Sequence, residues 1–211
     1  MKMTKAKFIL MFSVFFGITF QVFPQAIKNK SESKFVYQTS FGFSNGLGKI
    51  QFDDRSITNN IPTFKVQQLL AYQFNNYIIA GVGGGLDIWK KSAFIPLYAN
   101  LSVNFINRNV TPHWYLNVGY AFKWYVSTRP DPMTLVIHGG APGPYGETGL
   151  GIKIRMSDRL SFIITANYMA YYSQINYSVV EPDEIDFSKY ATNRSMKTFY
   201  HFVGLKVGVM Y

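Results

Sequence analysis

Charged side chains are few in this chain, and those inside its apolar segments fall at alternating positions. Asp, Glu, Lys and Arg together make up only 15% of the 211 residues. Successive side chains of a β-strand point to opposite faces, so charges at alternating positions share one face. That face can form ion pairs, and it holds Lys65, Asp87, Lys123, Glu147, Lys153, Arg155 and Lys206.

Lys65 and Asp87 are predicted to form an ion pair across a hairpin. Both residues lie at odd positions, and directly paired residues of an antiparallel ladder share a face. A three-residue turn at Asn75–Tyr77 pairs Phe74 with Ile78 and therefore places Lys65 opposite Asp87. A buried ion pair of this kind is tolerated, whereas the removal of one partner is costly.

The same reasoning predicts a second ion pair and a basic group. Lys123 and Glu147 are expected to meet between two later segments. Lys153, Arg155 and Lys206 lie toward the opposite end of the polar face, with no acidic partner in the strands. Water, Asn or Tyr side chains would have to serve these cations. We therefore expect an interior that is plugged by side chains and crossed by ion pairs, with no continuous pore.

The elements that must position these charges are eight segments with a period of two, which is the period of a β-strand. In each segment one face is apolar and holds no Asp, Glu, Lys or Arg. Together they predict an all-β protein, an eight-stranded antiparallel up-and-down barrel. The segments are residues 35–43, 64–74, 78–88, 95–105, 114–124, 148–156, 160–172 and 199–211.

Two kinds of barrel fit eight such strands. A soluble barrel would turn the apolar faces inward, whereas a membrane barrel would turn them outward against lipid. Eight strands leave an interior only just wide enough for side chains. The large aliphatic and aromatic residues of the apolar faces would not fit there, but the glycines and few polar groups of the opposite faces would. The volume therefore favours a transmembrane β-barrel.

Two tryptophans and the lengths of the connections agree with a membrane barrel. Trp114 and Trp124 lie ten residues apart on one face. At about 3.3 Å per residue and a tilt of about 40°, they span roughly 25 Å, the distance between two aromatic girdles. Short connections at 75–77, 106–113 and 157–159 alternate with long ones at 45–62, 127–145 and 173–196. The link at 89–93 is the exception, a short loop on the outer side.

The N-terminus predicts export. Residues 1–26 read as a cleavable signal peptide, because three lysines precede an apolar stretch at 8–20 that is too short to span a bilayer as a helix. Residues 27–34 form a short polar lead-in, and residues 35–211 form the barrel. The formal charge of +10 could suggest nucleic acid, but the export signal argues against that partner.

These features together resemble the small outer-membrane β-barrel domain family, the OmpA-type and OmpX-type barrels of Gram-negative bacteria. The resemblance rests on FIPLYANLSVNF at Phe94–Phe105, GLGIKIRMSDRLSF at Gly149–Phe162 and the aromatic C-terminal residue Tyr211. It covers nearly all of the chain after the signal peptide. The pattern is specific for architecture and weak for function, since this family includes membrane anchors, adhesins and small pores.

The resemblance implies a location and a set of partners. The protein would be integral to the outer membrane with both termini in the periplasm, and Tyr211 would be the signal read by the barrel-assembly machinery. Its partners would be outer-membrane lipid, lipopolysaccharide and an unknown extracellular ligand. Lipopolysaccharide phosphates suit the basic residues expected at or beyond the outer rim, which are Lys90, Lys91, Arg129, Lys189, Arg194 and Lys197.

The resemblance implies three possible functions. We expect a non-enzymatic, adhesion-like protein that displays its long loops at the cell surface, and no cofactor or metal. A small-solute pore is the alternative. A lipid A-modifying enzyme is a third, because some eight-stranded barrels hydrolyse or transfer acyl chains with a His and a Ser. Of His113, His138 and His201, His201 faces lipid, but Val203 stands where such a hydrolase carries its serine.

Overall fold

The computed structural model describes residues 34–52, 55–89, 92–126, 135–141, 143–158, 160–179 and 192–211. The predicted signal peptide, residues 1–26, and nearly all of the lead-in lie outside these residues. Among the residues described, no helix is long and apolar enough to cross a membrane.

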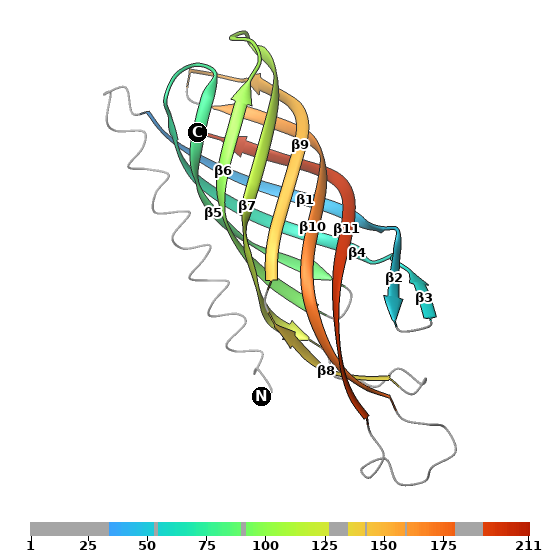
Figure 1. The fold of residues 1–211 in the computed structure, drawn as a ribbon. Helices are drawn as coiled ribbons and strands as arrows, with labels where there is room; N and C mark the ends of the chain where they lie inside the picture. Colours follow the sequence, from blue (N-terminus) through green and yellow to red (C-terminus); the bar gives the residue numbers. More distant parts are fainter. Residues whose placement is uncertain are drawn as a thin grey trace, which may run out of the picture. The chain divides into compact units, whose positions relative to one another are not determined.

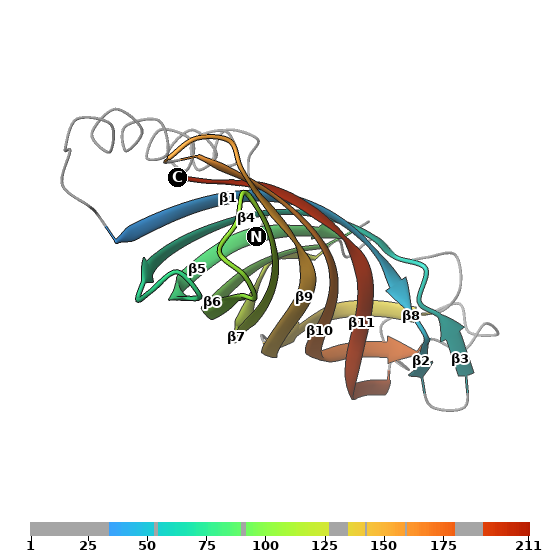
Figure 2. The same ribbon diagram turned by 90° about the horizontal axis from the view of Figure 1, so that it is seen from above.

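Eight antiparallel strands form a closed barrel, as predicted (Figures 1 and 2). Each strand pairs with its two neighbours, and the pairing of β10 with β11 completes the circle. In order around the wall the strands are β1 (Phe35–Leu47), β4 (Pro62–Gln73), β5 (Ile78–Trp89), β6 (Ser92–Asn104), β7 (Val110–Val126), β9 (Gly143–Arg155), β10 (Ser161–Val179) and β11 (Thr192–Met210).

The first and last strands close the barrel along a regular ladder. Ser40 of β1 lies opposite Gly208 of β11. The backbone N–H of Tyr37 donates to the Tyr211 carbonyl at 2.8 Å, and the Tyr211 N–H donates back to Tyr37 at 2.9 Å. The two tyrosine rings are stacked, with centroids 6.0 Å apart. The C-terminal residue is thus part of the barrel wall.

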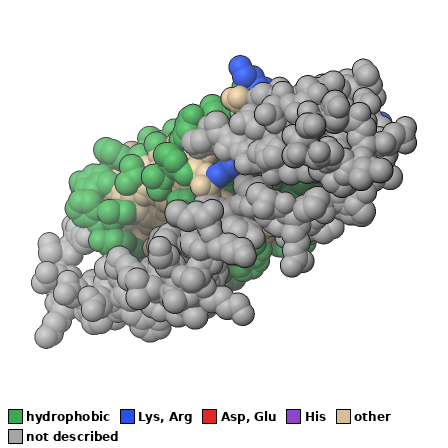
Figure 3. Space-filling view, turned by 90° about the horizontal axis from the view of Figure 1, so that it is seen from below, with side chains coloured by type: hydrophobic (Ala, Val, Ile, Leu, Met, Phe, Trp, Pro, Cys, Tyr) green, Lys and Arg blue, Asp and Glu red, His purple; other side chains and the backbone are tan. Residues whose placement is uncertain are grey.

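The alternation predicted from the sequence is confirmed. Outward positions remain exposed, as at Val82, Leu150 and Leu205, whose exposed fractions are 64%, 59% and 63%. Inward positions are buried even when charged, as at Lys65 and Glu147, which are 0% and 1% exposed. Hydrophobic side chains accordingly gather on the described part of the face that Figure 3 shows. The apolar band faces outward, which is the arrangement of a membrane barrel.

The barrel has two different ends. We call the end that holds Phe35 and Tyr211 the terminal end, and the opposite end the loop end. Connections at the terminal end are short, as predicted. In the turn at Asn75–Tyr77, the Asn75 side chain accepts 2.8 Å hydrogen bonds from the backbone N–H groups of Tyr77 and Ile78. The turn pairs Phe74 with Ile78 as expected.

Strands at the loop end are longer than predicted, and parts of the expected loops are themselves strands. β10 and β11 remain paired from Ser161↔Met210 to Val179↔Thr192. The short strand β8 (Leu135–Ala141) pairs with the loop-end part of β10, and β2 (Lys49–Phe52) pairs with β3 (Arg55–Thr58). The prediction ended each strand where the apolar face ended. Ladder hydrogen bonds need no apolar face, so they continue beyond it.

Candidate functional site

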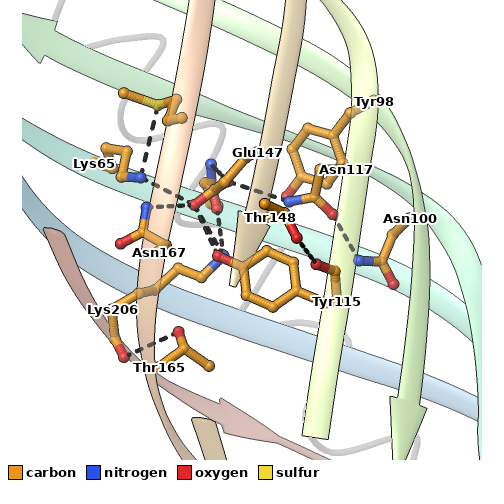
Figure 4. Close-up of polar contacts among 12 residues, drawn as sticks. Lys65, Tyr98, Asn100, Tyr115, Asn117, Glu147, Thr148, Thr165, Asn167 and Lys206 are labelled. Atoms are coloured by element: carbon orange, nitrogen blue, oxygen red, sulfur yellow. Dashed lines mark hydrogen bonds and ion pairs between the residues drawn. The ribbon is translucent and has the colours of Figure 1, made fainter. Parts of the chain in front are cut away.

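The centre of the barrel interior is organised around the carboxylate of Glu147, which lies on β9 (Figure 4). Its Oε1 atom accepts hydrogen bonds from Lys65 Nζ at 2.9 Å, Asn167 Nδ2 at 2.9 Å, Tyr115 Oη at 3.0 Å and Lys206 Nζ at 3.3 Å. The two lysines are its ion-pair partners. A fully buried charge is stable only with such partners.

The second oxygen of the same carboxylate is also fully used. Glu147 Oε2 accepts from Tyr145 Oη at 2.5 Å, Gln67 Nε2 at 3.0 Å and Asn117 Nδ2 at 3.2 Å. Seven donors from five strands therefore converge on one side chain. We call these eight residues the Glu147 hub: Lys65, Gln67, Tyr115, Asn117, Tyr145, Glu147, Asn167 and Lys206.

The predicted ladder position of Lys65 is confirmed, but its ion pair is different. Lys65 lies directly opposite Asp87 in the β4–β5 ladder. The Lys65 ammonium nevertheless points across the interior to Glu147, and neither oxygen of the buried Asp87 carboxylate has a hydrogen-bond partner among the described residues. In a narrow barrel, strands that are not neighbours face one another across the interior. A hairpin ladder alone cannot show those contacts.

The predicted pair of Lys123 with Glu147 is wrong. Asn117, not Lys123, lies opposite Glu147 in the β7–β9 ladder. The register of this ladder differs by six residues from the one that was assumed, which paired Tyr125 with Tyr145. The Lys123 ammonium instead lies 3.5 Å from the Gln174 carbonyl and 5.9 Å from the centre of the Phe94 ring.

The basic group splits into three environments. Lys206 was expected to lack an acidic partner, but it belongs to the Glu147 hub and lies 3.9 Å from the centre of the Tyr115 ring. Arg155 is exposed at the terminal end and donates to Asn107 Oδ1 at 3.2 Å. For Lys153, the described part of the chain provides no hydrogen-bond or ion-pair partner, so the Asn or Tyr contact that was expected is not found there.

A cluster of buried aromatic side chains fills the loop-end half of the interior. The Trp89 ring centroid lies 4.3 Å from that of Phe94, 5.1 Å from Tyr171, 5.3 Å from Tyr200 and 4.9 Å from Phe202. We call these five residues the aromatic plug. All five are at most 7% exposed. They come from the loop-end parts of β5, β6, β10 and β11.

The aromatic plug was not predicted. Trp89 was assigned to a connection, and the inward positions were described by their glycines and charges. The signal was nevertheless present, because Tyr200 and Phe202 alternate with outward residues and so had to face inward. The same parity places Tyr171 of β10 inside, where it is 1% exposed.

The terminal-end half of the interior holds a cavity rather than a plug. Its lining is mainly amide, hydroxyl and basic side chains, and none of the lining residues is acidic. The polar and basic side chains of the lining include Asn100, Ser102, Asn104, His113, Lys153 and Lys206. They lie on the terminal side of the Glu147 hub or, for Lys206, within it.

The other residues singled out in the sequence lie on the outside or beyond the described side chains. The outward His201 accepts from or donates to Tyr168 Oη through Nδ1 at 2.6 Å. Outward Trp114 donates to Thr148 at 2.9 Å, whereas the Trp124 and His138 side chains lie outside the described residues. Of the six rim cations, only the exposed Lys197 has a described side chain.

Comparison with known proteins gives matches in structure but not in sequence. No family model matches the chain, and no curated protein matches it. The outer membrane protein OprG from Pseudomonas aeruginosa matches with a TM-score of 0.51 and 10% identity, over 82% of this chain and 94% of that one. Neisserial surface protein A (NspA) matches with a TM-score of 0.53 and 10% identity, over 84% and 96%. At this identity the likeness concerns the fold.

Proposed function

We propose that this chain, which has the fold of the eight-stranded outer-membrane barrels, is an integral outer-membrane protein. Its barrel is closed to solutes, and it acts at the cell surface through the strands that extend past the loop end. The proposed role is non-enzymatic and adhesion-like. The observation that carries the proposal is the Glu147 hub, in which one buried carboxylate bonds to seven side chains in the middle of the interior.

The Glu147 hub argues against a pore. A solute passing through the interior would have to separate Glu147 from Lys65 and Lys206, and it would leave buried charges without partners. The aromatic plug adds a second obstruction toward the loop end, where Phe202 is 0% exposed. Two consecutive layers of side chains are therefore expected to keep the barrel shut.

The loop end supports a role at the surface. β10 and β11 continue as a paired ribbon to Val179↔Thr192, and β8 adds a third strand beside it. Figure 1 shows this part of β10, β11 and β8 leaving the barrel wall at the loop end. Binding residues are often carried by segments that a regular scaffold positions, and this paired ribbon is such a scaffold at the loop end.

The proposal also fixes an orientation. Short connections belong to the periplasmic side of outer-membrane barrels and long ones to the outside. Both termini would therefore be periplasmic, and Tyr211 would be available to the barrel-assembly machinery before it pairs with Tyr37. Lipid and lipopolysaccharide would surround the outward band, with the exposed Lys197 near the phosphates.

A shortened hairpin tests the surface role. Replacing residues 174–197 by Asn-Gly should leave Ser173 and Thr198 joined by a two-residue turn, because these residues pair in the ladder. We expect a folded, heat-modifiable barrel in the outer membrane whose cells no longer bind the surfaces or host cells that wild-type cells bind. A matched control shortens the separate β2–β3 hairpin instead.

Three outcomes would contradict the proposal. Steady single-channel conductance of the wild-type protein in planar bilayers would show that the barrel conducts. Equal binding by cells with and without the protein, across the whole screen, would remove the surface role. A change in the acyl pattern of lipid A that depends on the protein would favour an enzyme.

A further inference from the structure

The terminal-end cavity has an excess of positive charge. The two lysines of the Glu147 hub, Lys65 and Lys206, both form ion pairs with Glu147. Lys153 belongs to neither ion pair. It lines the cavity, and no lining residue is acidic.

The N–H donors of the Lys153 ammonium group have no acceptor among the described residues. An ammonium group has three N–H donors. Lys153 is half-buried and faces inward near the terminal end of β9. It lies opposite Thr111 of β7 and opposite Ile163 of β10. No described side chain or carbonyl accepts a hydrogen bond from it. A half-buried ammonium in this position favours an anionic partner.

His113 lies on the same side of the cavity. It is 6% exposed and faces inward from β7, and its buried Nδ1 atom has no hydrogen-bond partner in the described structure. It lies opposite Gly151, which has no side chain and is two residues from Lys153 on β9. Diagonal positions on adjacent strands are within reach of long side chains. An imidazole and an ammonium therefore border the same space.

The neighbouring groups on the wall are polar. Asn100 accepts from Ser102 at 3.0 Å and donates to Asn117 at 2.6 Å, and Asn104 donates to the Asn76 carbonyl at 3.0 Å. Uncharged amide and hydroxyl groups can surround a small hydrated anion without repelling it. The terminal-end cavity thus combines a lysine without a described partner, a buried imidazole whose Nδ1 has no partner, and a wall that is polar in part and apolar at Leu69, Ile79, Ile163 and Met210.

We propose that the terminal cavity binds a small oxyanion of the phosphate class between Lys153 and His113. The ammonium supplies charge and up to three N–H donors, and the imidazole supplies a further N–H donor from its protonated nitrogen. Access is from the terminal end, where Lys153 is partly exposed. The inference does not depend on the surface role proposed above.

A pair of charge variants tests the site. Inorganic phosphate is titrated by calorimetry into the full-length mature barrel, folded in detergent micelles, at constant chloride. Lys153→Gln removes one of the two lysines that line the cavity, the one without an ion-pair partner. Arg155→Gln removes the same charge from the same face of β9, two residues away and outside the cavity lining. Both side chains are partly exposed, so both variants should fold, as checked by heat-modifiable mobility.

We expect the wild type and Arg155→Gln to bind phosphate alike, and Lys153→Gln to bind about tenfold more weakly or worse, as follows from losing a hydrogen bond from a charged donor. His113→Phe keeps a ring beside Tyr115 but removes the N–H donor, so it should also weaken binding. Absence of binding by the wild type would overturn the site. Equal weakening by Lys153→Gln and Arg155→Gln would overturn it as well, because that result reports net charge alone.

Discussion

The two halves of the barrel interior are built from the same strands by the same alternation, yet they are filled in opposite ways. The loop-end half holds the aromatic plug, whose ring centroids are as little as 4.3 Å apart. The terminal-end half holds a polar cavity lined by amides, hydroxyls and Lys153. The Glu147 hub lies between them. Its donors include Tyr145 on the plug side and Tyr115 on the cavity side.

The difference shows that an inward direction alone does not decide whether a side chain fills the interior or leaves a cavity beside it. Large rings fill the loop-end half, whereas the side chains of the terminal-end half leave a cavity between them. Gly149 faces the Tyr115 ring and Gly83 faces the Tyr98 ring, and a Cβ atom at either position would collide with that ring. Near the hub the glycines therefore make room for tyrosines. At Gly151, which lies opposite His113, a Cβ atom would collide with the Ile164 carbonyl and the Thr165 side chain, so this glycine leaves no free space.

Removing the charge of Glu147 should have the largest effect on stability, because the two halves of the interior meet at that side chain. Glu147→Gln keeps the shape of the side chain but leaves Lys65 and Lys206 buried with one carboxylate fewer. We expect the free energy of unfolding to fall by about 3–5 kcal/mol. Urea unfolding of the barrel in lipid vesicles, followed by tryptophan fluorescence, measures it.

Asp87→Asn is the matched control for that change. Asp87 is as deeply buried as Glu147, but its oxygens have no hydrogen-bond partners in the described structure. Its replacement should therefore cost much less than Glu147→Gln. If the two variants lost similar stability, the hub would not be centred on Glu147.

Tyr145 connects the plug to the hub and gives the next largest effect. Its hydroxyl donates to Glu147 Oε2 at 2.5 Å and accepts from Gln67 Nε2 at 3.0 Å. Tyr145→Phe keeps the ring and removes both bonds, so we expect a loss of about 1.5–3 kcal/mol, the range for a hydrogen bond to a charged group. The same unfolding experiment checks it. A loss below that of an ordinary surface substitution would contradict the assigned geometry.

The wall of the barrel could be predicted from the sequence, and the hub could not. Alternation gave the face of each strand, and turn length gave the Lys65↔Asp87 register. Both are properties of neighbouring residues and neighbouring strands. The contact of Lys65 with Glu147 joins β4 and β9, which are not neighbours in the sheet. It depends on how far the strands are shifted relative to one another around the whole barrel, and the long connection between β7 and β9 does not reveal that shift in the sequence.

Two phenylalanines of β11 allow the packing inside the barrel to be compared with the packing on its outward face. Phe202→Leu removes part of a buried ring that lies 4.9 Å from the Trp89 ring. We expect a loss of about 1–2 kcal/mol from the lost burial and the small cavity left behind. Phe199→Leu is the control, because Phe199 is 56% exposed on the outward face, where lipid can fill the space. Equal losses in urea unfolding would mean that the plug is no better packed than the lipid-facing surface.

The smallest effect should come from Tyr171, and its sign is informative. Tyr171 and Tyr145 are both nearly fully buried, and their ring centroids are 5.0 Å apart. The Tyr171 hydroxyl has no hydrogen-bond partner among the described residues, whereas the Tyr145 hydroxyl has two. A buried hydroxyl without a partner costs free energy, so Tyr171→Phe removes a penalty and keeps the ring contacts with Trp89 and Phe202. We expect the free energy of unfolding to stay the same or to rise by a few tenths of a kcal/mol, in contrast to the fall for Tyr145→Phe. A loss as large as that of Tyr145→Phe would show that the Tyr171 hydroxyl is bonded, for example to water within the plug, and that the loop-end half is not dry.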